Sequence, residues 1–373
     1  MKKFQWTVNF VRLTSYGKKN MTVNTNDSED EDMELWKKFL DIATDHNSER
    51  DSKILGTVVL VVFTVGLVAN VLTCIVIYCD KTMHTATNYY LFNLAVSDII
   101  FASTFLMKVN SLAIVHASES LCLLHAFTLV FMYCNITYTI TVLAVERYVA
   151  ITNPTALNSS PIWKRVLKII LLIWLVSTVM SLPLLSTINI VKTENFSVCS
   201  ALPTTLTKII TLVMVIPMFV MPMMTMVYVY VKIVQEVTKI ENFNADNYAF
   251  NHHNNKSKVN KLAVALTLSF LICWGPFFCT RILLFSLSVK QIIRLSQWWR
   301  WMDNVTFIAS SSSILINPVL FSLISSKFRK ALKKFWFTKI MGRTDKENGP
   351  TSTGTGLIER RETYVKRVTE TSF

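Results

Sequence analysis

The chain has 373 residues, of which 51% are hydrophobic and only 17% are charged, and its mean hydropathy is +0.39. Soluble proteins carry charge on about a quarter of their residues, so this composition excludes an ordinary soluble fold. The formal net charge of +14 is common in nucleic-acid-binding proteins, but here the basic residues gather at the ends of apolar segments, as in membrane proteins. We therefore expect a membrane protein that binds no nucleic acid.

Residues 1–53 are polar and are expected to form an N-terminal tail before the first membrane span. No apolar core follows Met1-Lys2-Lys3, so the sequence predicts no cleavable signal peptide. The acidic stretch from Ser28 to Glu34 is expected to be solvated and disordered; steering of a ligand is the alternative role for its charge.

Seven apolar segments follow, and each is long enough to cross a bilayer, for which about 20 residues suffice. They predict an all-α membrane protein, a seven-transmembrane helix bundle over residues 54–325. The predicted spans are Ile54–Cys79, Asn88–Asn110, Leu121–Ile151, Val166–Thr187, Leu206–Val234, Leu262–Leu287 and Trp301–Ile324.

The orientation follows from the basic residues near the span ends, which favour the cytoplasmic side. They cluster after the third and last spans and before the sixth: Arg147, Lys164, Arg165, Lys256, Lys258, Lys261, Lys327, Arg329, Lys330, Lys333 and Lys334. We therefore expect a multi-pass plasma-membrane protein with its N-terminus outside and its C-terminus in the cytoplasm. Glycosylation sequons on the expected outer side begin at Asn20, Asn26 and Asn195.

The segment after the last span, residues 326–337, has apolar residues on one helical face and cations on the other. This pattern predicts a short amphipathic helix at the inner membrane surface, in contact with membrane lipid. Residues 338–373 are polar and are expected to form a disordered cytoplasmic tail.

Two of the seven cysteines lie on the expected outer side, Cys122 at the outer end of the third predicted span and Cys199 in the loop after the fourth. That side is oxidising, so a disulfide between them is the natural interpretation, with two free thiols as the alternative. No Cys/His spacing indicates a metal site, and no arrangement of side chains indicates catalysis, so we do not expect an enzyme.

Glu146-Arg147-Tyr148 lies at the inner end of the third span. An arginine is unfavourable in lipid and persists there mainly with a partner and a function. Because Glu146 can hold Arg147 in one state and release it in another, the triplet predicts a conformational switch. Pro222, Pro276 and Pro318 each remove a backbone N–H and predict kinks in three spans.

Each predicted span carries a recognisable motif. In chain order the motifs are Asn70, Leu94-Ala95-Val96-Ser97-Asp98, Glu146-Arg147-Tyr148, Trp174, Pro222 with Tyr230, Cys273-Trp274-Gly275-Pro276 and Asn317-Pro318-Val319-Leu320-Phe321. With these motifs the chain resembles the rhodopsin-like class of G-protein-coupled receptors, and the resemblance extends from Ile54 to Phe337.

The resemblance implies a set of site residues and partners. An allosteric sodium ion, the one cofactor to consider, would be bound by Asp98, Asn70, Asn317 and Ser313; a buried structural acid is the alternative for Asp98. The activation switch would comprise Glu146, Arg147, Tyr148, Tyr230, Trp274, Pro276, Asn317, Pro318 and Phe321. Phe321 departs from the family's usual tyrosine and has no hydroxyl to reach Tyr230. The implied partners are a heterotrimeric G protein and, at a phosphorylated tail, arrestin.

The stretch from Thr85 to Asp98, together with Arg281, resembles receptors of the neuromedin U, pyrokinin and capa group, so we expect a peptide ligand and a calcium-mobilising Gq protein. Leu129 replaces the aspartate of amine receptors, and Val109 and Val130 replace acids of the neuromedin group. The expected ligand residues are Lys108, His125, Leu129, Arg281, Asp303 and Trp274. An orphan receptor, a receptor for a lipid or other small molecule and, more remotely, a transporter are the alternatives; the internal repeats typical of transporters are not found.

Overall fold

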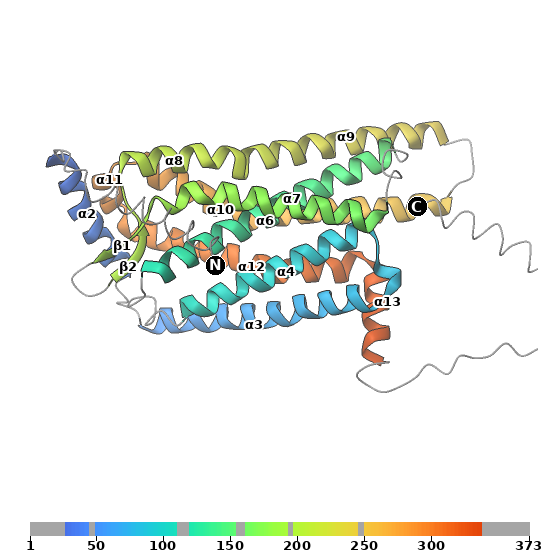
Figure 1. Ribbon diagram of the computed structural model, residues 1–373, viewed down its shortest axis with the longest axis horizontal. Helices are drawn as coiled ribbons and strands as arrows, with labels where there is room; N and C mark the ends of the chain where they lie inside the picture. Colours follow the sequence, from blue (N-terminus) through green and yellow to red (C-terminus); the bar gives the residue numbers. More distant parts are fainter. Residues whose placement is uncertain are drawn as a thin grey trace, which may run out of the picture. The chain divides into compact units, whose positions relative to one another are not determined.

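The computed structural model describes residues 27–44, 49–109, 119–153, 161–192, 197–244 and 250–337 (Figure 1). Its larger elements are α2 (Asp27–Thr44), α3 (Glu49–Cys79), α4 (Ala86–Val109), α6 (Glu119–Thr152), α7 (Ile162–Leu185), β1 (Ile188–Lys192), β2 (Ser197–Ala201), α8 (Thr205–Val215), α9 (Met221–Asn244), α10 (Phe250–Ser286), α11 (Val289–Arg294), α12 (Ser296–Ile324) and α13 (Ser326–Phe335). A 3-10 helix η1 (Lys81–Met83) precedes α4, and a π-helical turn η3 (Ile216–Val220) joins α8 to α9.

Within the described residues, six helical segments have the length and apolar composition needed to cross a membrane. They are Leu60–Cys79, Glu119–Thr152, Ile162–Leu185, Thr205–Glu236, Val264–Ser286 and Asn304–Ile324. The remaining predicted span corresponds to α4, which is 24 residues long and packs against α3, α6, α7 and α12. Helices are the expected form because lipid offers no hydrogen bonds, so each segment must satisfy its own backbone.

Several helices extend beyond the apolar segments that predict them. α3 begins at Glu49 and α10 at Phe250, although their apolar segments begin at Ile54 and Leu262. Hydropathy marks where a helix can meet lipid, whereas its backbone hydrogen bonds continue into polar sequence.

α6 lies in the interior of the bundle and packs against α4, α7, α9 and α10. α12 packs against α3, α4 and α10. At Gly66, α3 approaches α12 so closely that an added Cβ would clash with the side chain of Ile314. Small residues permit such close approaches between membrane helices.

α7 shows how the helices divide into buried and exposed faces. Ile173, Ser177 and Ser181 recur every four residues and are buried, whereas Leu171 and Leu175 are at least 60% exposed. A soluble monomer rarely exposes so much contiguous apolar surface, so this face is suited to lipid.

The acidic stretch from Ser28 to Glu34 is not a disordered tail, as the sequence analysis expected, but the beginning of α2. Trp36, Phe39 and Leu40 of α2 are buried in a cluster with residues of β1, α11 and α12: Val191, Val289, Ile292 and Trp299. The spacing of three and four residues gives α2 an apolar face that its high charge obscures in the sequence. Lys290 of α11 also pairs with Glu31 of α2 at 2.8 Å, and this hydrogen bond raises the pKa of Lys290.

β1 and β2 form an antiparallel hairpin in which Ile190 is opposite Cys199. The hairpin lies with α2 and α11 at one end of the bundle, on the left in Figure 1, which we call the hairpin end.

α13 follows α12 after Ser325, whose hydroxyl accepts a hydrogen bond from the Phe328 backbone N–H at 3.2 Å. It occupies the segment expected to be an amphipathic helix, and within it Phe328 and Ala331 are buried. The predicted sequons at Asn20, Asn26 and Asn195 and the polar tail after residue 337 lie outside the described residues.

Candidate functional site

The predicted disulfide is present between Cys122, in the first turn of α6, and Cys199 of β2. Their Cα atoms are 5.7 Å apart, within the ordinary range for a disulfide. The bridge joins the β hairpin to the start of α6 and fixes that end of the helix.

The predicted ligand residues are distributed over the hairpin half of the bundle. His125 and Leu129 occupy successive turns of α6 and are half-buried. Arg281 of α10 is also half-buried, and its guanidinium lies 5.1 Å from the ring centre of Phe277. The backbones of Lys108 and Asp303 are in α4 and α12, but their side chains lie outside the described residues.

Trp274 of α10 belongs to an aromatic cluster that joins three helices. Its ring centre lies 4.7 Å from that of Tyr133 on α6 and 5.8 Å from that of Phe101 on α4. Tyr133 also contacts Phe278 of α10, with ring centres 4.9 Å apart. Trp274 was predicted from the sequence but Tyr133 was not, although Tyr133 was detectable because it lies one helical turn after Leu129 on the same face of α6.

The π-helical turn η3 is hydrogen-bonded to α6 through two tyrosines. The Tyr133 hydroxyl donates to the carbonyl of Met218 at 3.0 Å, and the Tyr138 hydroxyl donates to the carbonyl of Pro217 at 3.2 Å. In this turn the Met221 N–H donates five residues back, to the Ile216 carbonyl.

Pro222 explains why these two carbonyls need side-chain donors. The next π-helical bond would run from residue 222 to Pro217, and an α-helical bond from residue 222 would reach Met218. Pro222 has no N–H and can make neither bond. The predicted kink at Pro222 is therefore a π-helical turn whose orphaned carbonyls are satisfied by α6.

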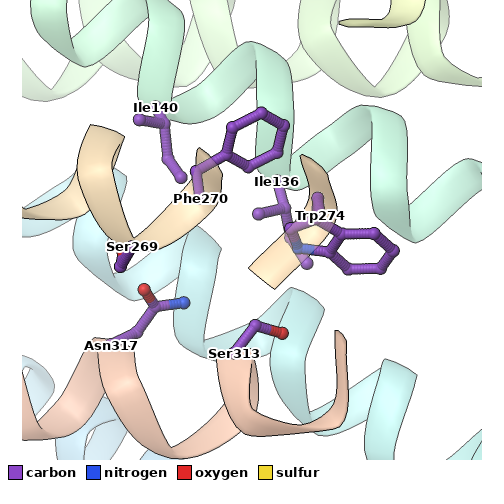
Figure 2. A pocket seen from close by; sticks show the side chains of 7 residues that line it. All are labelled: Ile136, Ile140, Ser269, Phe270, Trp274, Ser313 and Asn317. Carbon is purple, nitrogen blue, oxygen red and sulfur yellow. The ribbon is translucent and has the colours of Figure 1, made fainter. Parts of the chain in front are cut away.

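A small cavity is lined in part by Trp274 and has room for about one water molecule. Figure 2 shows its lining residues, which come from α6, α10 and α12: Ile136, Ile140, Ser269, Phe270, Trp274, Ser313 and Asn317. It brings together Trp274 with two residues predicted for the sodium site, Ser313 and Asn317.

Asp98 of α4 is completely buried, and its Oδ2 accepts a hydrogen bond from Asn317 Nδ2 at 2.9 Å. Asn70 donates to the carbonyls of Gly66 and Ile314, both at 2.9 Å. The Oδ1 atoms of Asp98 and Asn70 have no hydrogen-bond partner within the described part of the chain. Two orphaned buried oxygens are suitable ligands for a small hard cation.

A second polar network connects α4, α6 and α7. Asn93 Nδ2 donates to Asn135 Oδ1 and Thr139 Oγ1, at 2.9 and 2.8 Å. Ser97 Oγ donates to the same Asn135 oxygen at 2.9 Å, and Trp174 Nε1 donates to Asn93 Oδ1 at 2.9 Å. Trp174, which the sequence analysis noted as a motif, thus binds α7 to α4.

The ionic triplet lies at the opposite end of α6 from the disulfide. Glu146 Oε1 is 3.7 Å from Arg147 Nη2, as predicted for a pair, but only 2.9 Å from Nη2 of Arg165 on α7. Arg165 was predicted to lie in a cytoplasmic loop, so this contact was not predicted from the sequence. The contact could have been predicted from helical spacing, since Arg165 precedes the buried residue Ile173 of α7 by two steps of four residues.

The other predicted switch residues are distributed over α6, α9, α10 and α12. Tyr148 is half-buried, and the Tyr230 hydroxyl of α9 accepts a hydrogen bond from Thr267 of α10 at 2.9 Å. Phe321 is completely buried. Pro276 and Pro318 lie inside α10 and α12.

Comparison with known proteins finds a match between residues 69–321 and the family model described as 7 transmembrane receptor (rhodopsin family). Neuromedin-U receptor 2 of Rattus norvegicus is 30% identical over 288 residues, which cover 73% of this chain and 72% of the rat protein. The Neuromedin U receptor homolog nmur-2 of Caenorhabditis elegans is 27% identical over 317 residues, covering 74% and 78% of the two chains. The Pyrokinin-1 receptor of Drosophila melanogaster is 24% identical over 337 residues, again covering 74% and 78%.

Proposed function

Because the chain belongs to the rhodopsin family of seven-transmembrane receptors, we propose that it binds an extracellular peptide and activates a heterotrimeric G protein inside the cell. The family makes it a multi-pass membrane receptor and not an enzyme. The observation that carries the peptide class is the similarity to proteins named neuromedin-U and pyrokinin receptors. It confirms the resemblance found in the motifs.

The proposed orientation places the hairpin end outside the cell and the Glu146 end in the cytoplasm. The Cys122–Cys199 disulfide supports this orientation because disulfides persist on the oxidising side. The basic residues of α13, including Lys327 and Lys330, support it because cations favour the cytoplasmic side and its anionic lipid. Arrestin is a further proposed partner, through phosphorylation of the tail.

Ligand binding would shift the population between two arrangements of the bundle. A peptide bound among His125, Leu129 and Arg281 lies above the aromatic cluster, so it can displace the ring of Trp274 in contact with Tyr133. Pro276 follows Trp274 by two residues in α10 and provides the hinge at which the inner half of this helix swings outward. Arg147 then leaves Glu146 and faces the G protein.

Sodium is proposed to bind beside this hinge and to favour the inactive arrangement. The oxygens of Asp98 and Asn70 would hold the ion, Ser313 would add a hydroxyl oxygen, and Asn317 would orient Asp98 through the hydrogen bond at 2.9 Å. A bound cation would supply the positive charge that this buried carboxylate needs.

The test is expression in cultured cells, stimulation with a library of amidated and free-acid peptides, and readouts for each G-protein class. We expect a peptide to evoke a calcium response through Gq, the transducer of the neuromedin-like group. Arg147→Ala should abolish the response and leave peptide binding intact, because Arg147 lies about 37 Å along α6 from Cys122. Activation by a lipid or an amine, with all peptides inert, would refute the peptide assignment.

A further inference from the structure

Among the residues that the structure describes, the carboxylate at the centre of the ionic switch has two cationic neighbours. Glu146 Oε1 lies 2.9 Å from Nη2 of Arg165 and 3.7 Å from Nη2 of Arg147. The Glu146 side chain is only 6% exposed, and each arginine side chain is 18% exposed. These charges are therefore weakly screened by solvent, and the nearer arginine attracts the carboxylate about 1.3 times as strongly by Coulomb's law.

The two arginines differ in what they do when the bundle opens. Arg147 is adjacent to Glu146 on α6 and must turn toward the G protein. Arg165 is on α7, which packs along α6 and is separate from the Pro276 hinge of α10. The Glu146–Arg165 pair can therefore remain intact in both arrangements.

From this geometry we propose that Arg165 is a positioning residue of the switch, which competes with Arg147 for Glu146 and keeps Glu146 paired after Arg147 leaves. The proposal rests on the proposed G-protein signalling. Competition for one oxygen weakens the hold of Glu146 on Arg147 in the inactive arrangement. Continued pairing avoids a buried, uncompensated carboxylate in the active arrangement, which is strongly unfavourable. Both effects favour activation.

The surroundings of Glu146 strengthen this role. The second carboxylate oxygen, Oε2, accepts no hydrogen bond from the described residues. With Arg165 removed and Arg147 turned away, this buried carboxylate would lose both of these cations.

The consequence is an opposite effect of two neutralising substitutions. Glu146→Gln frees Arg147 and should raise agonist-independent signalling. Arg165→Gln leaves Arg147 as the partner of Glu146 and should lower agonist-independent signalling. The expected decrease is on the order of 5-fold, the lower end of the usual coupling between sites. The double variant should signal like Glu146→Gln, because without the Glu146 carboxylate the two arginines have nothing to compete for. If Arg165 only stabilised the fold, the double variant would signal less than Glu146→Gln.

The experiment measures nucleotide exchange by purified G-protein heterotrimers of each class, with full-length receptor variants at matched amounts and without agonist. Binding of nucleotide-free heterotrimer to the same variants provides a second readout. Arg165→Lys should retain most of the wild-type exchange because it keeps the charge. Lys164→Gln and Lys168→Gln remove exposed charges from the same helix and should leave exchange unchanged.

Exchange by Arg165→Gln equal to or above wild type would overturn the proposal. A double variant that signals clearly less than Glu146→Gln would also overturn it, and this comparison holds even where Arg165→Gln alone accumulates poorly. Failure of every variant, Glu146→Gln included, to activate any heterotrimer would instead refute the proposed function.

Discussion

Substitution of Tyr133 offers the sharpest test of how α6 stabilises the π-helical turn η3 between α8 and α9. Tyr133→Phe removes one hydroxyl and retains the ring that packs 4.7 Å from Trp274. The Met218 residue is only 3% exposed, so its carbonyl would lose a hydrogen bond of 3.0 Å and gain no water. Leaving one buried acceptor unsatisfied costs about 1–3 kcal/mol. We expect the substitution to lower the thermal stability of the receptor.

The assay heats purified receptor in detergent with a dye that fluoresces on reaction with thiols. Cys134 and Cys273 are buried and react only as the bundle opens. Tyr228→Phe makes the same chemical change on a side chain that is 60% exposed, so its transition midpoint should equal that of wild type. Equal midpoints for Tyr133→Phe and Tyr228→Phe would refute the reasoning.

Three further predictions concern the disulfide, the buried acid and the ligand. Cys122→Ala and Cys199→Ala should each reduce surface expression, and the double variant should be no worse than either single one because both remove the same bridge; additive losses would contradict this. Asp98→Asn should abolish the fall in agonist affinity as sodium replaces a larger monovalent cation, and an undiminished sodium effect in radioligand displacement would disprove the site. Arg281→Ala should weaken peptide binding more than Lys108→Ala does, since a guanidinium contact is hard to replace; equal losses in a binding isotherm would argue against Arg281 as the main contact.

The bundle itself was predictable because a bilayer sets a minimum length for each apolar segment. The disulfide was predictable because Cys122, at the outer end of the third predicted span, and Cys199, in the loop after the fourth, both lie on the expected oxidising side. These inferences depend on composition along the chain and need no knowledge of packing.

Contacts between helices were harder to predict from the sequence. Tyr133 and Tyr138 are recognisable as partners of η3 only once Pro222 is known to interrupt a π-helical turn. The sequence did not distinguish Arg165 from the other expected cytoplasmic cations, because a count of charges does not show which cation faces a neighbouring carboxylate. α2 was missed because its acidic residues dominate the local charge, while its apolar face is completed by distant elements such as α11.

The packing of α2 also bears on how the protein is expressed. A leader or affinity tag joined ahead of Asp27 leaves the helix with its contacts on β1, α11 and α12. Deletion of residues 1–44 as dispensable sequence would instead expose Val289, Ile292 and Trp299 to water. Such a shortened chain would present an adhesive apolar surface, prone to aggregate during purification.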